Sequence, residues 1–279
     1  MLLNKHRFAL LVALATVSLP LAAQAQRKSP LADAPAIRKR FELRQTRLEL
    51  GAGAGTTINQ DFYHTVMVNA RLAFHITDWL SLAVFGDFGV AQVATGFENK
   101  VVTSLDPMNQ SNVQREPLRA SGEAGLQQIS NILGGQLEFT PFTGKFSLFG
   151  KLFAAYDFYA YVGGAGITVK TAGSTLSNGA ALRSCDDAVP ADMTDQSRYV
   201  CAVKGLKPGP TFGVGFHTFF GQGVGLAVDL RDVMAQLNPS GRDVNGDLQA
   251  DKNDLSWTHT YVLTGNLVVY LPFQAKVSP

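Results

Sequence analysis

The sequence lacks a long apolar run after its first segment: beyond Ala25 no stretch of about 18 apolar residues occurs, and a spanning helix needs about 20. Charged residues are also few, at 16%, whereas 27 glycines and 18 phenylalanines are many for a soluble domain. No basic run interleaved with aromatics is present, so we expect no nucleic-acid partner. If the chain lies in a membrane, it must do so as a closed barrel, which satisfies every backbone amide in lipid.

The first 25 residues have the pattern of an export signal. Residues 5–7 are basic, residues 8–21 are almost wholly apolar, and Ala23-Gln24-Ala25 has the small-x-small spacing of a signal-peptidase site. We predict a cleaved signal peptide and a mature chain that starts near Gln26, with a retained anchor helix as the alternative. No cysteine follows the site, which argues against a lipoprotein anchor.

Eight later segments alternate between apolar and other residues with period two, as barrel strands do in lipid. The clearest is Leu80–Val90, in which Leu82, Val84 and Phe88 share one face and Asp87 lies on the other. The eight segments are 47–52, 65–76, 80–90, 133–140, 146–163, 212–217, 224–231 and 257–271. The pattern predicts an all-β fold, an eight-stranded antiparallel transmembrane β-barrel, with a soluble barrel or sandwich as the alternative.

The predicted connections alternate in length. Three are tight turns, at Thr77–Trp79, Thr143–Lys145 and Gly221–Gly223, whereas the others run to about 12, 35, 45 and 20 residues. Short periplasmic turns and long extracellular loops are typical of outer-membrane barrels. We therefore expect a signal peptide at 1–25, a periplasmic leader at 26–40, the barrel at 41–273 and a periplasmic tail at 274–279.

The inward face of these strands carries ten charged or titratable residues. They are Arg47, Glu49, Arg71, Asp87, Glu138, Lys151, Asp157, His217, Asp229 and Arg231. An eight-stranded barrel has an interior that side chains fill, and buried charges are tolerated there when they are paired. We predict a lumen network that plugs the barrel, with a proton or ion path along the same residues as the alternative.

Cys185 and Cys201 are the only cysteines, and both lie in the longest loop. A cysteine pair in an exported protein predicts a disulfide, which here would staple an exposed loop. A redox or metal role is disfavoured because no histidine lies close to either cysteine in the sequence.

The loop before the last strand has oxygen ligands at the spacing of an EF-hand or dockerin-type calcium loop. The ligands would be Asp243, Asn245, Asp247, Asp251 and Asp254. Two departures weaken the pattern, because Leu248 stands where glycine is usual and Asp254 where glutamate is usual. Calcium is the one cofactor that the sequence indicates, and a solvated loop without a metal is the alternative.

Two pairs at the predicted outer rim have the residue types of a catalytic pair. Asp61 precedes His64, and Ser256 precedes His259. A histidine beside a carboxylate or hydroxyl could activate water or a nucleophile. Polar residues also occupy the rim of any barrel, so we predict no catalytic residues and no enzymatic activity.

Three segments resemble the outer-membrane β-barrel domain family common in myxobacteria and their relatives. They are Gly223–Asp232, Leu263–Phe273 and the predicted central hairpin Glu138–Phe146. The chain departs from the family at Val233 and Met234, where an aromatic usually follows the aspartate matched by Asp232. The resemblance implies an outer-membrane location, with some members linked to envelope complexes, and implies no catalytic residues. The last strand also resembles the signal that the barrel-insertion machinery reads, through Gly265, Val268 and Tyr270.

The sequence as a whole predicts a non-enzymatic barrel that is a structural or interaction component of the Gram-negative outer membrane. Its expected partners are outer-membrane lipid, the barrel-assembly machinery during insertion, and envelope proteins. Two alternatives stay open: a narrow channel for small solutes or ions, and a lipid- or peptide-modifying barrel enzyme that uses the rim histidines.

Overall fold

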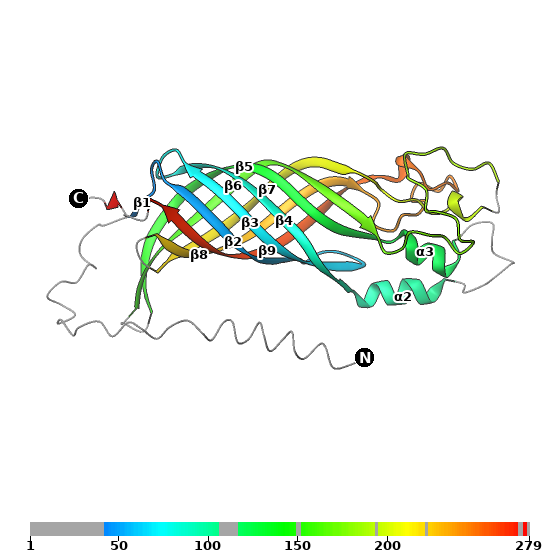
Figure 1. The fold of residues 1–279 in the computed structure, drawn as a ribbon, viewed down its shortest axis with the longest axis horizontal. Coiled ribbons are helices and arrows are strands. Elements are labelled where there is room, and N and C mark those ends of the chain that lie inside the picture. The colour runs from blue at the N-terminus through cyan, green and yellow to red at the C-terminus, as the bar shows by residue number, and fades with distance from the viewer. Residues whose placement is uncertain are drawn as a thin grey trace. The chain divides into compact units, whose positions relative to one another are not determined.

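The computed structural model describes residues 42–105, 117–148, 152–192, 195–220, 223–272 and 276–277 (Figure 1). Eight strands form a closed barrel in which each strand pairs with the next and the last pairs with the first. They are β2 (Leu48–Thr57), β3 (Tyr63–His75), β4 (Leu80–Ala94), β5 (Gln127–Leu148), β6 (Leu152–Thr171), β7 (Leu206–Phe219), β8 (Val224–Leu237) and β9 (Ser256–Leu271). All eight pairings are antiparallel, so the predicted eight-stranded antiparallel barrel is confirmed.

Closure removes the sheet edges over the barrel wall. The first and last barrel strands pair over ten residues, from Leu48 opposite Leu271 to Thr57 opposite Val262. A short pair, β1 (Glu42–Leu43) with β10 (Lys276–Val277), joins the two chain segments that flank the barrel. Because closure satisfies the backbone amides between strands, such a wall can face lipid without unpaired backbone groups.

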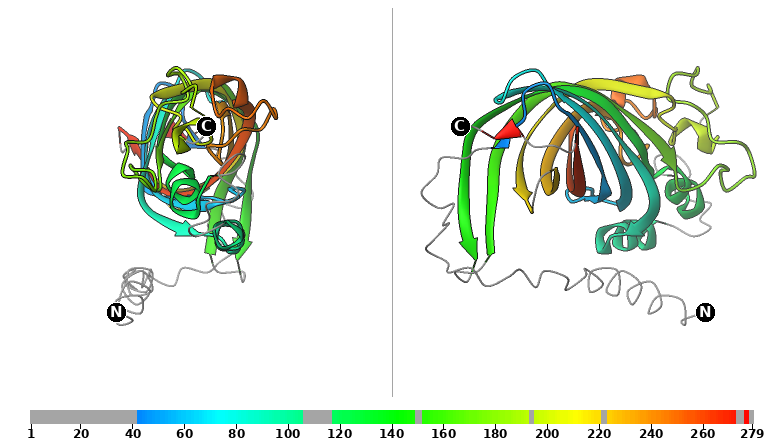
Figure 2. Two further views of the ribbon diagram at one scale, coloured as in Figure 1. Left: turned by 90° about the vertical axis from the view of Figure 1, so that its right-hand side faces the viewer. Right: turned by 60° about the vertical axis from the view of Figure 1, so that its left-hand side comes forward.

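The helices and the long connections lie at one end of the barrel, which we call the loop end; the opposite end, with the short connections, is the turn end (Figures 1 and 2). The helices within the described residues are α2 (Gly96–Ser104), α3 (Arg119–Gly125) and the 3-10 helices η1 (Gln196–Arg198) and η2 (Lys252–Asp254). The Thr95 hydroxyl accepts the Glu98 amide at 3.1 Å and starts α2. No helix in the described part of the chain is both long and apolar enough to cross a membrane.

The expected turn at Thr143–Lys145 is wrong. These residues continue β5 and pair with β6, with Thr143 opposite Asp157 and Lys145 opposite Ala155. A Cβ on Gly144 would lie 2.5 Å from the Tyr156 ring, so this glycine permits a close cross-strand approach and is not a turn residue. The β5–β6 hairpin, green in Figure 2, therefore extends past its neighbours at the turn end.

Of the other two predicted turns, the structure describes the first completely and the second only in part. The Thr77–Trp79 turn joins β3 to β4, with the amides of Ile76 and Thr77 donating to the Leu80 carbonyl at 3.0 and 3.1 Å. Of the Gly221–Gly223 turn only Gly223 is described, and its φ is +101°. The signal peptide and the leader lie outside the described residues, as do most residues of the predicted tail.

The barrel interior changes character along its axis. Toward the turn end it holds charged and polar side chains together with a small apolar cluster of Phe219, Ala227, Val268 and Tyr270. Toward the loop end the inward residues are mostly apolar. The strand residues of the apolar layer at the loop end are Met67, Phe85, Ile129, Ile132, Ala165, Ile167, Val169, Val233, Ala235, Leu237 and Val262. The sequence pattern did not predict this second layer, because it treats the inward face of a barrel strand as polar throughout.

Candidate functional site

The charged layer is centred on Arg71 of β3. Its guanidinium bonds Glu49 of β2 at 2.6 Å and Glu138 of β5 at 2.5 Å, and all three side chains are almost wholly buried. Glu49 also lies 3.0 Å from the Nε2 atom of His75. One arginine thereby links two carboxylates from opposite sides of its own strand, as buried charges require.

His217 of β7 connects this centre to the turn end. Its Nε2 atom lies 3.2 Å from Arg71 Nη1, and its Nδ1 atom lies 2.8 Å from Asp157 of β6. The other oxygen of Asp157 lies 2.8 Å from the guanidinium of Arg44. Arg44 precedes β2 and is itself held by Asp78, which accepts its amide at 2.7 Å. Ion pairs and hydrogen bonds, packed against the rings of Phe219 and Tyr270, therefore fill the turn end of the lumen.

A second charged group lies nearer the middle of the barrel. Arg231 of β8 bonds Asp87 of β4 at 2.8 Å, and its guanidinium stacks 3.4 Å above the Phe85 ring. Asn69 donates to the same carboxylate at 2.5 Å. Asp229 accepts from the Tyr159 hydroxyl, which completes the polar layer below the apolar one.

The structure buries nine of the ten residues predicted for the lumen, with Lys151 outside the described residues. His75 and Arg44 are two members that this prediction did not include, and Arg44 is the less predictable of the two. It lies outside the alternating segments, so no periodicity marks it as inward, and only the folded chain brings it to Asp157.

The loop end of the barrel is closed by the connection between β6 and β7. Cys185 and Cys201 form a disulfide with a Cα–Cα distance of 4.9 Å. Both cysteines, with Val203 and with Ala250 of the β8–β9 connection, pack against the apolar inward residues of the strands. The expectation that the disulfide staples an exposed loop is therefore wrong: the apolar strand ends bury it in the barrel mouth.

We call the described parts of the three long connections, residues 95–105 with 117–126, 172–205 and 238–255, the cap. Hydrogen bonds join its segments: Cys201 donates to Gly241 at 2.8 Å, and Gln127 at the start of β5 donates to Pro239 at 2.9 Å. The guanidinium of Arg183 donates to the carbonyls of Ser197 at 3.0 Å and of Ala250. Burial lowers the pKa of Arg183 from its ordinary value, against the opposing effect of Asp187. A small core of its own, Leu176, Leu182, Tyr199, Val200 and Ala202, adds to these bonds.

The predicted calcium loop lies in the cap, and its side-chain oxygens accept backbone amides. Asp243 accepts from Gly246 and Leu248 at 2.7 and 2.8 Å, and Asp254 accepts from Val244 and Asp251 at 2.8 Å each. Within the described residues, no three His, Cys, Asp or Glu side chains gather as metal ligands. Calcium binding by this loop stays a prediction.

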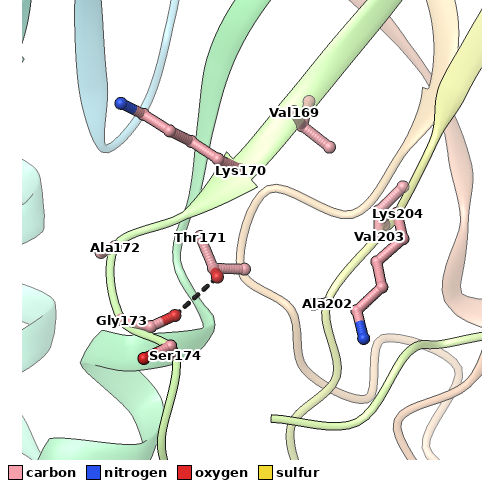
Figure 3. Close-up of a pocket in the computed structure, with 9 residues that line it drawn as sticks. All are labelled: Val169, Lys170, Thr171, Ala172, Gly173, Ser174, Ala202, Val203 and Lys204. Carbon is pink, nitrogen blue, oxygen red and sulfur yellow. Dashed lines mark hydrogen bonds between the residues drawn. The ribbon is translucent and has the colours of Figure 1, made fainter.

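A pocket of about 400 Å³ opens where β6 enters the cap, lined by residues 169–174 and 202–204 (Figure 3). Within this lining the Thr171 hydroxyl donates to the Gly173 carbonyl at 2.6 Å. In Figure 3 the ammonium of Lys170 points away from Lys204, so the two lysines do not converge on a ligand.

The rim pairs are rearranged relative to the sequence prediction. His259 bonds Asp232 of β8, with 2.6 Å between Nδ1 and Oδ2. Ser256 lies three residues before His259 on β9, on the other face of the strand, because side chains alternate along a strand. The backbone carbonyl of Asp61 accepts a hydrogen bond from the Thr95 hydroxyl. No bond between Asp61 and His64 occurs in the described structure.

Comparison with known proteins leaves the family open. No protein-family model and no curated protein sequence matches this chain. Among solved structures, it is similar to the N-terminal β-barrel domain of Pseudomonas aeruginosa OprF (8% identity, 80% of this chain and 98% of that one, TM-score 0.34). It is also similar to the outer membrane protein OprG of that species (9%, 81% and 95%, TM-score 0.36) and to LpxR from Salmonella typhimurium (9%, 80% and 99%, TM-score 0.20). At these TM-scores function must be argued from the chain's own residues.

Proposed function

We propose that the chain is an exported outer-membrane β-barrel that serves as a structural and interaction component of the cell envelope. The observation that carries the proposal is the cap, a cross-bonded unit whose disulfide is buried in a closed barrel mouth. Envelope proteins are the expected partners of the cap, and the barrel-insertion machinery is the expected partner during assembly.

The outer wall supports a membrane location. Large apolar side chains are exposed along every barrel strand, among them Val68, Val84, Leu137, Val228 and Leu267, each at least 45% exposed. On β9 the outward residues run from Leu271 to Tyr261, about ten residue steps, which at ~3.3 Å per residue and a tilt of ~40° spans about 25 Å. The apolar band of an outer-membrane barrel has about this height.

The lumen supports a role without solute passage. Ion-paired side chains and a small apolar cluster fill its turn end, and packed apolar side chains with a disulfide fill its loop end. A hydrated path would have to break both layers. No observation therefore favours the channel alternative over the structural one.

The cap supports a role in recognition. Loops that bind partners gain affinity when they are held in one conformation before binding, because less entropy is then lost. Here the disulfide, the cross-loop hydrogen bonds and the small apolar core hold the loops in this way.

A photo-crosslinking amino acid at Val244, which is 66% exposed in the cap, tests the proposal in native outer membranes. We expect a discrete protein adduct at Val244, and only lipid adducts at a matched site, Trp79, which is 53% exposed at the turn end. Recovery of the chain in the inner membrane or in the soluble fraction would contradict the location. Correct fractionation without any protein adduct at Val244 would contradict the interaction role alone.

A further inference from the structure

A histidine–carboxylate pair lies on the outward face of the barrel wall. Asp232 follows Leu230 on the outward side of β8, and His259 precedes Tyr261 on the outward side of β9. The strands place Asp232 opposite Tyr261 and Met234 opposite His259, so the pair meets diagonally, at 2.6 Å. Charged groups on the lipid-facing side of a barrel are destabilising at the membrane centre and tolerated near its surface.

The pair lies at the boundary of the apolar band. Below it, toward the turn end, the outward residues of the two strands are apolar, with Leu230 and Leu263 exposed by 41% and 42%. Beside and above it are Tyr261 and Trp257, aromatic residues of the kind that gather where headgroups meet acyl chains. Ester bonds that join acyl chains to a lipid backbone lie at this depth.

The histidine of the pair is exposed and the carboxylate is buried, as expected of a general base and of the group that orients it. The Asp232 side chain is 6% exposed, whereas that of His259 is 46% exposed. The second carboxylate oxygen of Asp232 is buried without a hydrogen-bond partner in the described structure. In the described structure the imidazole is therefore the one hydrogen-bond partner of this carboxylate.

The β9 backbone that carries the imidazole is also held in place, by Asn59 of the β2–β3 connection. The Asn59 side chain donates to the His259 carbonyl at 2.8 Å and accepts the Tyr261 amide at 2.8 Å, so it fixes the β9 backbone directly after His259. The Tyr261 ring lies 6.1 Å from the imidazole ring. With Nδ1 donating to Asp232, Nε2 is left as the basic atom on the exposed ring.

We propose that His259 and Asp232 form a general-base dyad that hydrolyses acyl esters of outer-leaflet lipids, an activity that rests on the membrane placement proposed above. Nε2 of His259 takes a proton from water while the water oxygen bonds to the ester carbonyl carbon. The tetrahedral intermediate then loses its alcohol, the acyl C–O bond breaks, and the imidazolium returns the proton to the leaving oxygen. One ester and one water become one fatty acid and one alcohol, with no other reactant.

Water is the nucleophile in this scheme because Ser256 lies on the other face of β9. Asp232 is a positioning residue: it sets the imidazole tautomer and stabilises the imidazolium, and it does not touch the ester. The expectation of a chain without enzymatic activity would be revised by this one site, and the lumen and the cap would keep their structural roles.

The experiment uses the full mature chain reconstituted in two kinds of vesicle, one of diacyl phosphatidylethanolamine and phosphatidylglycerol and one containing lipopolysaccharide. Fatty acid release is measured by mass spectrometry. We expect release from at least one, and the vesicle that yields it identifies the lipid class. His259→Gln should lower the rate by about 100-fold or more, the usual contribution of a general base.

Two further variants separate catalysis from structure. Asp232→Asn should slow release and shift its pH–rate profile, and Asp232→Glu should restore part of the rate. Gln236→Ala, at an exposed position on the outward face of β8 opposite Trp257, is the matched control and should leave the rate unchanged.

Heat-modifiable gel mobility reports insertion independently of hydrolysis. An inserted wild-type chain that releases no fatty acid from either vesicle, or a His259→Gln chain as active as wild type, would overturn the dyad and leave the proposed function intact. A chain that does not insert into either vesicle would overturn both.

Discussion

At the scale of single residues, Arg71 compensates the charge of two buried carboxylates, so the stability of the charged lumen depends on it. It bonds both Glu49 and Glu138, and these side chains are almost fully removed from solvent. Removing one partner of a buried ion pair leaves a charge without compensation, which costs more than the pair contributes.

We expect Arg71→Ala to lower the free energy of unfolding by about 3–5 kcal/mol, because both carboxylates then lose their cation. Urea titration in detergent micelles measures this. Lys204→Ala, at an exposed cap position, is the control and should change stability by less than ~0.5 kcal/mol. Combining Arg71→Met with Glu49→Gln and Glu138→Gln should recover much of the loss, and no recovery would contradict the electrostatic explanation.

At the scale of elements, a tyrosine of β6 packs closely over a glycine of β7. Tyr159 of β6 lies opposite Gly215 of β7, and a Cβ built on Gly215 would be 2.1 Å from the tyrosine ring. The ring thereby lies over the neighbouring strand and stacks on His217 with a centroid distance of 4.4 Å, and the Tyr159 hydroxyl donates to Asp229.

We expect Gly215→Ala to displace the Tyr159 ring and destabilise the barrel by about 1–3 kcal/mol, as overpacking does. Gly265→Ala is the matched control on β9, because nothing lies within 4 Å of its added Cβ. Unfolding midpoints in micelles compare the two. Equal midpoints for both variants would show that the ring does not depend on the glycine.

The disulfide restricts the conformation of the β6–β7 connection, not that of the barrel. The bridge closes a loop of about 15 residues, worth ~3 kcal/mol in the chain-entropy model. We expect Cys185→Ser with Cys201→Ser to leave the barrel folded, because the ion-paired layer is independent of the bridge. Limited proteolysis should then cut within residues 172–205 faster than in wild type, and an unchanged cleavage rate would mean that packing alone holds the cap.

At the scale of the whole molecule, two unlike layers close one barrel. The charged layer is held by partners from at least five strands, and the apolar layer is held by strands and connections together. Either layer alone would block a lumen of this width, since eight strands leave space only for side chains.

We therefore expect no steady conductance from the purified chain in planar bilayers. Reduction of the disulfide should not open a path, because the charged layer remains closed when the cap loosens. A porin reconstituted in the same way serves as the positive control. Steady unitary currents from the wild-type chain would contradict the plugged lumen and favour the channel alternative.

The sequence by itself determined the strand count and the side of the wall that most strand residues face. Both follow from a local period of two: Arg71 and Asp87 alternate with apolar neighbours such as Leu72 and Phe88, and the fold buries the first pair and exposes the second. The two cysteines could likewise be paired, since no others compete.

Only the tertiary structure decided which inward or outward residues meet. Arg44 reaches Asp157, His259 reaches Asp232, and the disulfide enters an apolar mouth. Each contact joins residues at least 16 positions apart, and it depends on strand register and barrel closure, which no local period encodes. The same reason explains Gly144, which resembles a turn residue in sequence and lies within a strand because Tyr156 crosses it.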